Sequence, residues 1–284
     1  MPMNGRVLTS AFIAVATAGV AHASEGVAAK ADVLLRIFGL PITNSIVTAW
    51  IVSLLILVVV RLMIRRPQLV PGRGQAIVEA ALSGVRDIVA PIVGKKAIGA
   101  ALPLLLCLFF FILLQNWAGL LPGVGSIGFE HDGHFIPFIR PGTADMNATL
   151  ALAAVAMISW FYIVMRYAGP KVLLFDIFGN KADKNEVPKV IYYFLFLIFF
   201  LVGGIEIISI CFRPVSLSFR LFGNVFGGEN LLHQTFPFAF PFYFLELLIG
   251  FVQALVFTLL TSVYIGLICN HGDDHGTEGA GGHH

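Results

Sequence analysis

Charge and cysteine are both scarce in this sequence, and each shortage excludes a class of protein. Only 12% of the 284 residues are charged, whereas soluble domains carry about 25%. An ordinary globular enzyme, a disordered protein and a nucleic-acid-binding protein are therefore excluded. The sequence has 3 cysteines, too few for a disulfide scaffold. All of them lie in apolar stretches and are expected to be small buried hydrophobic residues: Cys107, Cys211 and Cys269.

Apolar residues make up 58% of the chain and include 26 Phe, with a mean hydropathy of +0.89. A helix of roughly 20 apolar residues crosses the ~30 Å hydrocarbon layer of a membrane. Five windows reach this length: residues 42–63, 99–121, 146–167, 190–212 and 242–269. The sequence therefore predicts an all-α polytopic membrane protein with five transmembrane helices. It shows no internal repeat of the kind that many secondary transporters have.

Residues 75–98 differ from the apolar windows on either side, because apolar residues recur there in steps of three and four. The apolar stripe consists of Ile77, Ala80, Ala81, Val85, Ile88 and Val89. The charged residues of this segment lie off the stripe: Arg86, Asp87, Lys95 and Lys96. The pattern predicts one amphipathic helix on the surface of the membrane. A soluble helix packed on a partner protein is the alternative.

The basic residues between the apolar windows predict the orientation of the chain. Seven lie between residues 61 and 96, five between 166 and 189, and one, Arg140, between 122 and 143. Because loops rich in Lys and Arg stay in the cytoplasm, the first two segments and the amphipathic helix are expected to be cytoplasmic. The third segment is expected to be external. The mature N-terminus is then outside and the C-terminus inside, as in a multi-pass protein of the bacterial inner membrane.

The first 23 residues have the layout of a cleaved secretory signal peptide. Arg6 precedes an apolar run at 7–20, and Ala21 and Ala23 are small residues at the two positions that the signal peptidase reads. Cleavage after Ala23 is predicted. An uncleaved first membrane helix is the alternative, although the apolar run is shorter than a span requires.

The rest of the chain divides into three parts. Residues 24–41 are expected to be an external N-terminal segment, and residues 42–270 the membrane domain. Residues 271–284 form a Gly- and His-rich cytoplasmic tail that is expected to be solvated and unstructured. Metal binding is the alternative role of the histidines in this tail, which are His271, His275, His283 and His284.

The last third of the apolar chain carries five ionisable residues, which are Glu206, Arg213, Arg220, Glu229 and Glu246. Each costs a few kcal/mol inside a membrane and is therefore a candidate for function. The alternative is an ion pair that merely links helices. Arg213 is the best candidate for such a pair because it precedes Pro214, where a helix is expected to bend.

The apolar stretch from residue 190 to 236 is too long for one upright membrane helix. As a single helix its 47 residues would extend ~70 Å, more than twice the hydrocarbon thickness. It must tilt steeply, bend or fold back, and Pro214 supplies a bend. With the last apolar window it is expected to form a long, steeply tilted, Pro-bent helix pair. Such a pair presents a nearly horizontal face to a partner that slides past.

Helical spacing separates the polar residues of this stretch into two groups. Arg220 and Asn224 are four residues apart and share one face. Gly223, Gly227 and Gly228 add small surfaces where another helix can approach closely. Glu229 follows Arg220 by nine residues, which is about 180° around the helix and ~13 Å along it. Glu229 is therefore expected to belong to a different polar compartment.

A polar stripe on the last helix is expected to line a water-filled path with Glu229. Glu246, Gln253 and Tyr264 fall within about 20° of one line along that helix. Near the external end of the third window, Asp145 and Asn147 are candidates for the mouth of this path. Asp145 is alternatively the N-cap of the helix that follows.

At these residues the sequence resembles subunit a of the membrane sector of F-type ATP synthases. Residues 213–224 read RPVSLSFRLFGN, which matches the most specific motif of that family, and Gly228-Glu229 continues it at the usual spacing. Two further matches are NWAGLLPG at 116–123 and ADMNATLAL at 144–152. The last helix also fits, with Gln253-Ala254 and residues 261–264. The resemblance covers residues 40 to 270.

This resemblance implies a role for each candidate residue. Arg220 would be the essential arginine that faces the rotor ring of c subunits, displaces the proton from each incoming ring carboxylate and blocks a direct leak. The external half-channel would be lined by Glu229, Glu246 and Gln253, with Asn224 near the arginine. Glu206 would belong to the cytoplasmic half-channel. The family often has a histidine paired with a glutamate where this chain has Glu229 and Glu246.

The resemblance also implies partners and an overall activity. The partners would be the c-subunit ring, the peripheral-stalk b subunits, the rest of the ATP synthase complex and membrane lipid. The chain would have no catalytic site and no cofactor of its own, and would couple proton flow to ATP synthesis. One alternative is the same stator working with sodium. Another is an independent ion-coupled transporter or intramembrane enzyme, which the missing repeats and the missing His-Glu-x-x-His motif oppose.

Overall fold

The computed structural model describes most of the chain, namely residues 33–37, 40–64, 67–121, 128–131, 134–137, 140–170, 172–173, 189–235 and 240–274. The predicted signal peptide lies outside the described residues. So do the first part of the external segment and the last ten residues of the predicted tail.

Five helices of the described chain are long and apolar enough to cross a membrane, which confirms the predicted number. They are α2 (Asn44–Met63), α4 (Ile98–Gly119), α5 (Met146–Tyr167), α7 (Lys189–Gln234) and α8 (Phe240–Asp274). Large apolar side chains stay exposed on their outer faces, among them Leu57, Ile158 and Phe244. An apolar surface of this kind suits a lipid environment, because lipid tails are as apolar as leucine.

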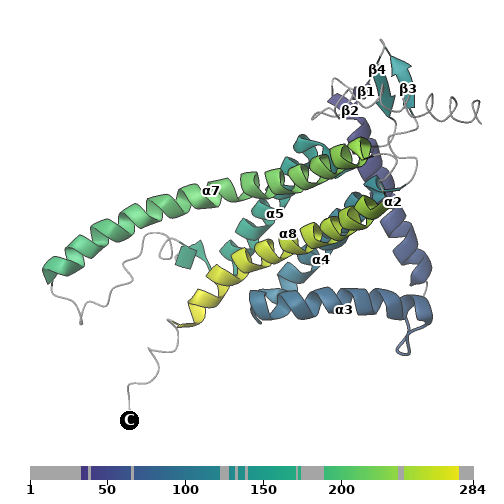
Figure 1. Ribbon diagram of the computed structural model, residues 1–284. Coiled ribbons are helices and arrows are strands. Elements are labelled where there is room, and N and C mark those ends of the chain that lie inside the picture. The colour runs from purple at the N-terminus through teal and green to yellow at the C-terminus, as the bar shows by residue number, and fades with distance from the viewer. Residues whose placement is uncertain are drawn as a thin grey trace, which may run out of the picture.

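Two short antiparallel hairpins were not expected from the sequence. One consists of β1 (Val33–Ile37) and β2 (Leu40–Thr43), and the other of β3 (Gly128–His131) and β4 (His134–Pro137). Both lie at the end of the bundle where α2 begins (Figure 1). A short 3-10 helix, η1 (Gly142–Ala144), leads from the second hairpin into α5.

Helix α3 (Arg73–Val93) confirms the helix predicted between the first two spans. Its apolar stripe is divided between two surroundings. Val85 and Val89 are buried against the bundle, whereas Ile77 and Ile88 are exposed. The reason is that α4 and α8 cover only one side of α3, so the second part of the stripe stays open.

The C-terminal end of α3 packs closely against α8. A Cβ added at Gly266 would collide with the backbone carbonyl of Ile92, so the two helices touch through their backbones. The Asn270 side chain donates to the same carbonyl at 3.3 Å. Gly94, which follows α3, has a φ of 82°, a conformation that glycine adopts readily. This glycine lets the chain turn directly from α3 toward α4.

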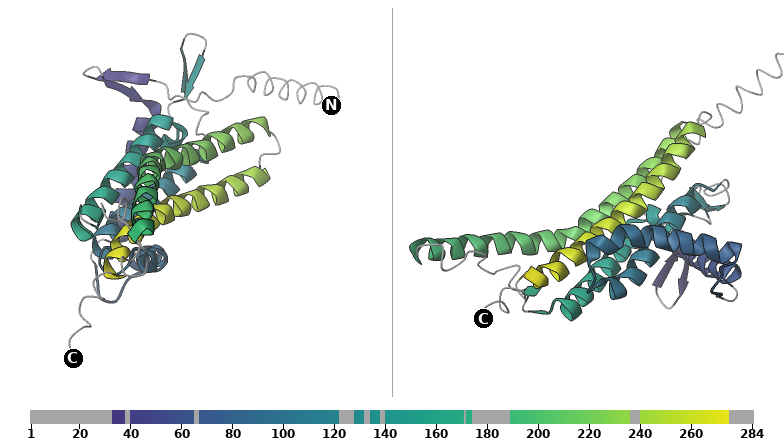
Figure 2. Two further views of the ribbon diagram at one scale, coloured as in Figure 1. Left: turned by 90° about the vertical axis from the view of Figure 1, so that its left-hand side faces the viewer. Right: turned by 90° about the horizontal axis from the view of Figure 1, so that it is seen from below.

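Helix α7 is one continuous helix of 46 residues with Pro214 inside it. At 1.5 Å per residue it is about 69 Å long, as the long apolar stretch predicted. Figure 2 shows that it bends along its length and that α8 runs beside part of it. The chain therefore contains the expected long, bent helix pair.

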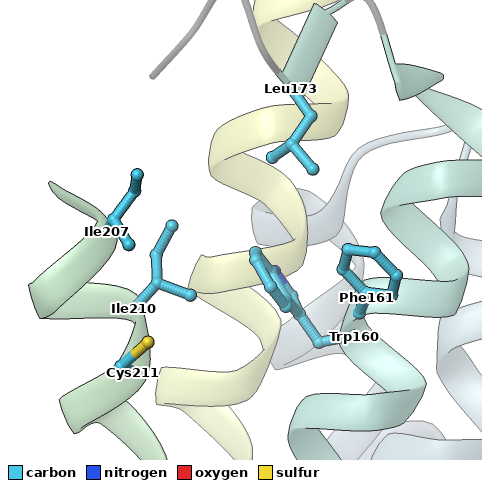
Figure 3. Close-up of a pocket in the computed structure, with 6 residues that line it drawn as sticks. All are labelled: Trp160, Phe161, Leu173, Ile207, Ile210 and Cys211. Carbon is cyan, nitrogen blue, oxygen red and sulfur yellow. The ribbon is translucent and has the colours of Figure 1, made fainter. Parts of the chain in front are cut away.

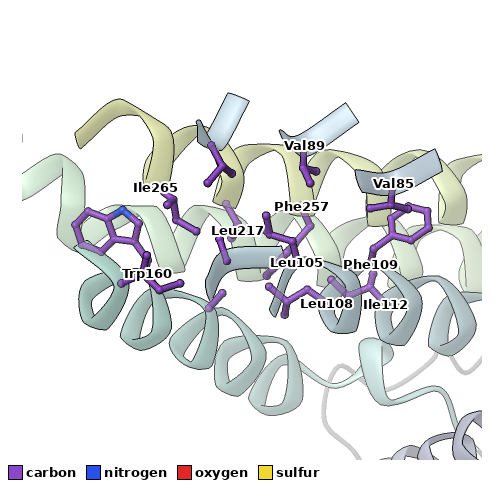
Figure 4. Close-up of a cluster of buried hydrophobic side chains, with 14 of the residues drawn as sticks. Val85, Val89, Leu105, Leu108, Phe109, Ile112, Trp160, Leu217, Phe257 and Ile265 are labelled. Carbon is purple, nitrogen blue, oxygen red and sulfur yellow. The ribbon is translucent and has the colours of Figure 1, made fainter. Parts of the chain in front are cut away.

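Helix α8 organises the core, since it contacts α3, α4, α5 and α7. Figure 4 shows buried side chains of these four helices meeting those of α8. Leu105, Ile112, Phe257 and Ile265 are almost wholly buried there. The core is thus a layer between the helices, while their other faces remain apolar and exposed.

The cysteines correct one expectation. Cys269 is buried as predicted, but Cys107 and Cys211 are exposed. Both of these belong to apolar helices with outer faces turned away from the bundle. Because a lipid-facing surface is as apolar as a core, hydropathy does not distinguish the two positions.

Candidate functional site

Arg220 lies on the open face of α7. The opposite face packs into the bundle through Leu217 and Leu221, which are both buried. Ser218 adds a contact of 3.0 Å between its hydroxyl and that of Thr149 on α5. These contacts fix the rotation of α7 about its axis, and they turn the Arg220 side chain outward, where it is exposed.

Small residues lie beside Arg220 on the exposed side of α7, together with the exposed ring of Phe219. A Cβ added at Gly223 or at Gly227 would meet no other atom within 4 Å, and Ser216 is exposed on the same side. Glycine and serine let another helix come close in a membrane. The long guanidinium side chain therefore projects from an open face that has room for a partner helix at Gly223 and Gly227.

Asn224 connects α7 to α8 one turn beyond Arg220. Its side-chain nitrogen donates to the Gln253 side-chain oxygen at 2.7 Å. Gln253 is 4% exposed whereas Asn224 is exposed, so this hydrogen bond lies at the edge of the α7–α8 interface. The two residues that the sequence placed near the arginine and in the external half-channel are therefore brought together.

Glu229 and Glu246 also face each other across α7 and α8. The Glu246 carboxylate lies against the backbone of Gly228, where an added Cβ would collide with both of its oxygens. The Glu229 carboxylate is near enough to act electrostatically on that of Glu246. Glu246 on α8 thus packs against α7 at Gly228, whereas Arg220 is exposed; the separate polar compartment for Glu229 stays a prediction.

Arg213 forms an ion pair, but with Glu206 of its own helix α7, whereas the sequence suggested a pair that links helices. Its Nη2 lies 2.6 Å from Oε1 of Glu206, and its guanidinium carbon lies 4.5 Å from the centre of the Tyr264 ring. The Trp160 ring is 6.0 Å away, and Trp160 Nε1 donates to the Tyr264 carbonyl at 2.7 Å. Side chains from α5, α7 and α8 thus meet at one arginine.

The two contacts between α7 and α8 keep the same spacing on both helices. Asn224 follows Arg213 by eleven residues, and Tyr264 follows Gln253 by eleven. The helices are therefore antiparallel and in constant register over about 16 Å. By this register Arg220 lies level with Phe257, which is buried in the core.

Asp145 is the N-cap of α5, which is one of the two roles that the sequence left open. Its side chain accepts from the backbone N–H of Asn147 at 3.1 Å and from the Asn147 side chain at 3.4 Å. Asp145 is 4% exposed. The two residues thus lie together at the hairpin end of the bundle, where a place in the external mouth stays a prediction.

Two residues of α4 hold α8 beside the acids, and the sequence reasoning gave them no role. Asn116 Nδ2 donates to the Gly250 carbonyl at 3.2 Å, and Trp117 Nε1 donates to the Leu247 carbonyl at 3.2 Å. Both carbonyls lie within one turn or so of Glu246. Their place in the motif at 116–123 was the available signal, but the motif does not reveal which helix they contact.

A buried polar cluster under the hairpins was also missed. The Arg140 backbone N–H donates to the Thr48 hydroxyl at 3.1 Å, and Gly142 N–H donates to Gln115 Oε1 at 3.3 Å. Arg140, Thr48 and Gln115 are all buried. These polar residues come from α2, α4 and the loop before η1, which lie far apart in the sequence.

Beside the Arg213 contacts, α5, α7 and Leu173 border an open pocket of about 190 Å³. Figure 3 shows the apolar side chains that line it, with Trp160 and Phe161 on α5 facing Ile207, Ile210 and Cys211 on α7. Within the described residues, no three His, Cys, Asp or Glu side chains come together in a way that could hold a metal ion.

Comparison with known proteins assigns the chain to a family. The family described as ATP synthase A chain matches residues 46–266. A protein named ATP synthase subunit a from Anaeromyxobacter dehalogenans (strain 2CP-C) is 30% identical over 252 residues, which cover 82% of this chain and 60% of that protein. One of the same name from Gloeobacter violaceus (strain ATCC 29082 / PCC 7421) is 30% identical over 239 residues, which cover 82% of this chain and 86% of that protein. The chain therefore belongs to the family of F-type ATP synthase subunit a.

Proposed function

We propose that this chain is the ion-translocating stator of a rotary F-type ATP synthase and that Arg220 acts on the carboxylates of the c-subunit ring. The observation that carries the proposal is the exposed position of Arg220 on α7, beside glycines with open space around them. A ring of helices fits against such a face. Each ring carboxylate then passes the guanidinium in turn.

For this role Arg220 must keep its positive charge throughout the cycle. An arginine stays protonated in proteins, and its planar fork binds a carboxylate through two hydrogen bonds. It displaces the proton from an incoming ring carboxylate and blocks direct passage between two aqueous half-channels. The proton carrier is the ring, so this chain needs no catalytic site or cofactor of its own.

The external half-channel is proposed between α7 and α8. Its lining residues would be Glu229, Glu246 and Gln253, with Asn224 next to Arg220 and with Asp145 and Asn147 at the mouth. The contact of Glu246 with Gly228 and the Asn224–Gln253 hydrogen bond support this place. Glu206, on the other side of Arg220 along α7, is proposed for the cytoplasmic half-channel.

The remaining proposals concern the setting of the chain. The peripheral-stalk b subunits would bind beside the ring-facing helix pair, in the bacterial inner membrane. The mature N-terminus would be external after cleavage following Ala23. The C-terminal tail would be cytoplasmic and solvated. ATP synthesis would be driven by proton flow through the assembled complex.

Replacing Arg220 tests the proposal in vesicles that carry the complete complex. Arg220→Ala should abolish ATP-driven acidification while the complex still assembles, because no positive charge would then displace the proton from each ring carboxylate. Arg166→Ala is the matched control, since Arg166 is an exposed arginine in the last turn of α5 and should pump as the wild type does. Wild-type pumping by Arg220→Ala would overturn the assignment.

The transported ion is tested by removing sodium. We propose a proton, with sodium as the alternative, and the ring rather than this chain supplies the binding carboxylate. Acidification of vesicles in a buffer free of sodium supports the proton. Pumping that requires sodium in the same vesicles supports the sodium-translocating stator.

A further inference from the structure

The hairpin of β3 and β4 brings two histidines to directly opposed positions. Its paired residues run from Gly128 and Pro137 at the open end to His131 and His134 at the other. The sequence between the histidines is Asp-Gly, at 132–133, which is typical of a two-residue hairpin loop. The register and the sequence therefore agree that the two histidines form the last pair of the ladder.

The spacing of these two positions suits a pair of metal ligands. Directly opposed residues of an antiparallel pair lie on the same face of the ribbon, with Cβ atoms about 4.5–5.5 Å apart. The two histidines of a His-Glu-x-x-His motif bind one zinc ion from one face of a helix. Their Cβ atoms have nearly the same separation, about 5–6 Å. His131 and His134 thus occupy positions from which two residues can share one ion.

The residue types and their setting favour a metal ion as well. Imidazole is a ligand that suits zinc, copper and nickel. Residues 130–134 read EHDGH, so two acids accompany the histidines, and their negative charge attracts a cation. The hairpin lies at the end of the bundle where α2 begins (Figure 1) and outside the five candidate membrane spans. Water can therefore take the coordination positions that the protein leaves open.

We propose that the directly opposed His131 and His134 of the β3–β4 hairpin bind a divalent transition-metal ion, with zinc as the representative. Each residue supplies one imidazole nitrogen, and water completes the coordination. The hairpin is a sheet of two strands, and such a hairpin is only marginally stable by itself. An ion that bridges its strands stabilises it. The site does not depend on the proposed function, because the bound metal is not the translocated ion.

Hydrogen exchange of the hairpin amides, measured on the complete complex with and without zinc, tests the proposal. An ion that binds only the formed hairpin stabilises it in proportion to 1 + [Zn]/Kd, so exchange should slow about tenfold at ten times the Kd. The β1–β2 hairpin is the internal control. It lies at the same end of the bundle and has no histidine between residues 33 and 43, so its exchange should not change. Magnesium prefers oxygen ligands and should protect neither hairpin.

Substitution of each histidine tests whether these two residues hold the ion. His131→Gln and His134→Gln should each weaken zinc binding at least about tenfold, because the loss of a residue that only supports a ligand already costs about 10–100-fold. His134→Cys supplies a thiolate, which also binds zinc, and should keep the protection. This rescue separates the loss of a ligand from damage to the hairpin.

The histidines of the C-terminal tail are the other candidates for zinc. A variant in which Gln replaces all four of them should show the wild-type protection of the β3–β4 hairpin. The replaced residues are His271, His275, His283 and His284.

Three results would overturn the proposal. The first is a wild-type hairpin whose exchange zinc does not slow. The second is a protection that persists in both His131→Gln and His134→Gln. The third is an equal slowing in the β1–β2 hairpin, which would be a general effect of zinc on the complex. None of these measurements involves pumping, so the assignment of Arg220 is tested separately.

Discussion

The carboxylate of Glu246 occupies the space that a side chain at position 228 would need. Gly228 lies inside α7, and an added Cβ there would push aside both Glu246 oxygens, which lie at the end of a flexible side chain. This relationship places Glu246 at the α7–α8 interface beside Glu229. It also allows the position of the acid to be changed without removing its charge.

Gly228→Ala should displace the Glu246 carboxylate and slow ATP-driven ion flux. Because these oxygens end a flexible side chain, the carboxylate can move aside, so flux should fall while the purified complex unfolds at nearly the wild-type temperature. Gly204→Ala is the matched control on the same helix, because a Cβ there would meet no atom within 4 Å. Equal behaviour of the two variants would show that the contact between Gly228 and Glu246 is unimportant.

Neutralising either acid should slow ion flux while the ring stays bound. Glu229→Gln and Glu246→Gln each keep the size of the side chain but remove a group that exchanges protons. Flux is measured as ATP-driven acidification of vesicles, and the retained ring is checked by the subunit composition of the purified complex. If flux is unchanged in both variants, these acids do not line the path.

Asn224→Ala should lower stability and flux together. The substitution removes a hydrogen bond with a net contribution of about 1 kcal/mol, and it leaves the buried Gln253 oxygen without this donor. Gln253 Nε2 already has no hydrogen-bond partner among the described residues. The substitution would remove the hydrogen bond at the Gln253 side-chain oxygen as well. In a double-mutant cycle with Gln253→Ala, the double variant should lose less free energy of unfolding than the sum of the losses in the two single variants. Simple additivity would mean that the pair does not act as a unit.

Two substitutions of Asp145 separate its role as a cap from a role in the mouth of the path. Asp145→Ala should destabilise the protein by about 1 kcal/mol because the N-cap of α5 is lost. Asp145→Ser keeps a capping oxygen but removes the carboxylate, so it should unfold at nearly the wild-type temperature. A reduced ion flux in Asp145→Ser supports the mouth. Wild-type flux in that variant limits Asp145 to capping.

The helices of this chain follow from hydropathy because each span needs a long apolar segment whatever it packs against. Helical spacing also gives the angle between Arg220 and Glu229, although not which of the two faces the rest of the bundle. The partners of a polar side chain do not follow. Asn116 and Gln253 contact other helices, and only the packing of the bundle decides which helix each one meets.

The two faces of α3 and the exposed cysteines show a second reason why part of the structure could not be predicted from the sequence. Ile77 and Val89 are equally apolar, yet one is exposed and the other is buried. In a membrane protein, apolar residues suit both the lipid and the core, so a hydrophobic stripe does not reveal which side the protein covers. The short hairpins, with four or five residues in each strand, are also too brief to leave a clear pattern.

The constant register of α7 and α8 restricts how the length of this chain can change. A residue inserted between Arg213 and Asn224 would rotate everything beyond it by about 100° and shift it by 1.5 Å, so one of the two contacts with α8 would be lost. Only a matching insertion between Gln253 and Tyr264 would bring both contacts back. Insertions between the two helices disturb neither contact. Natural variants and designed chimaeras should therefore change in length at the turn between α7 and α8, or in both helices at once.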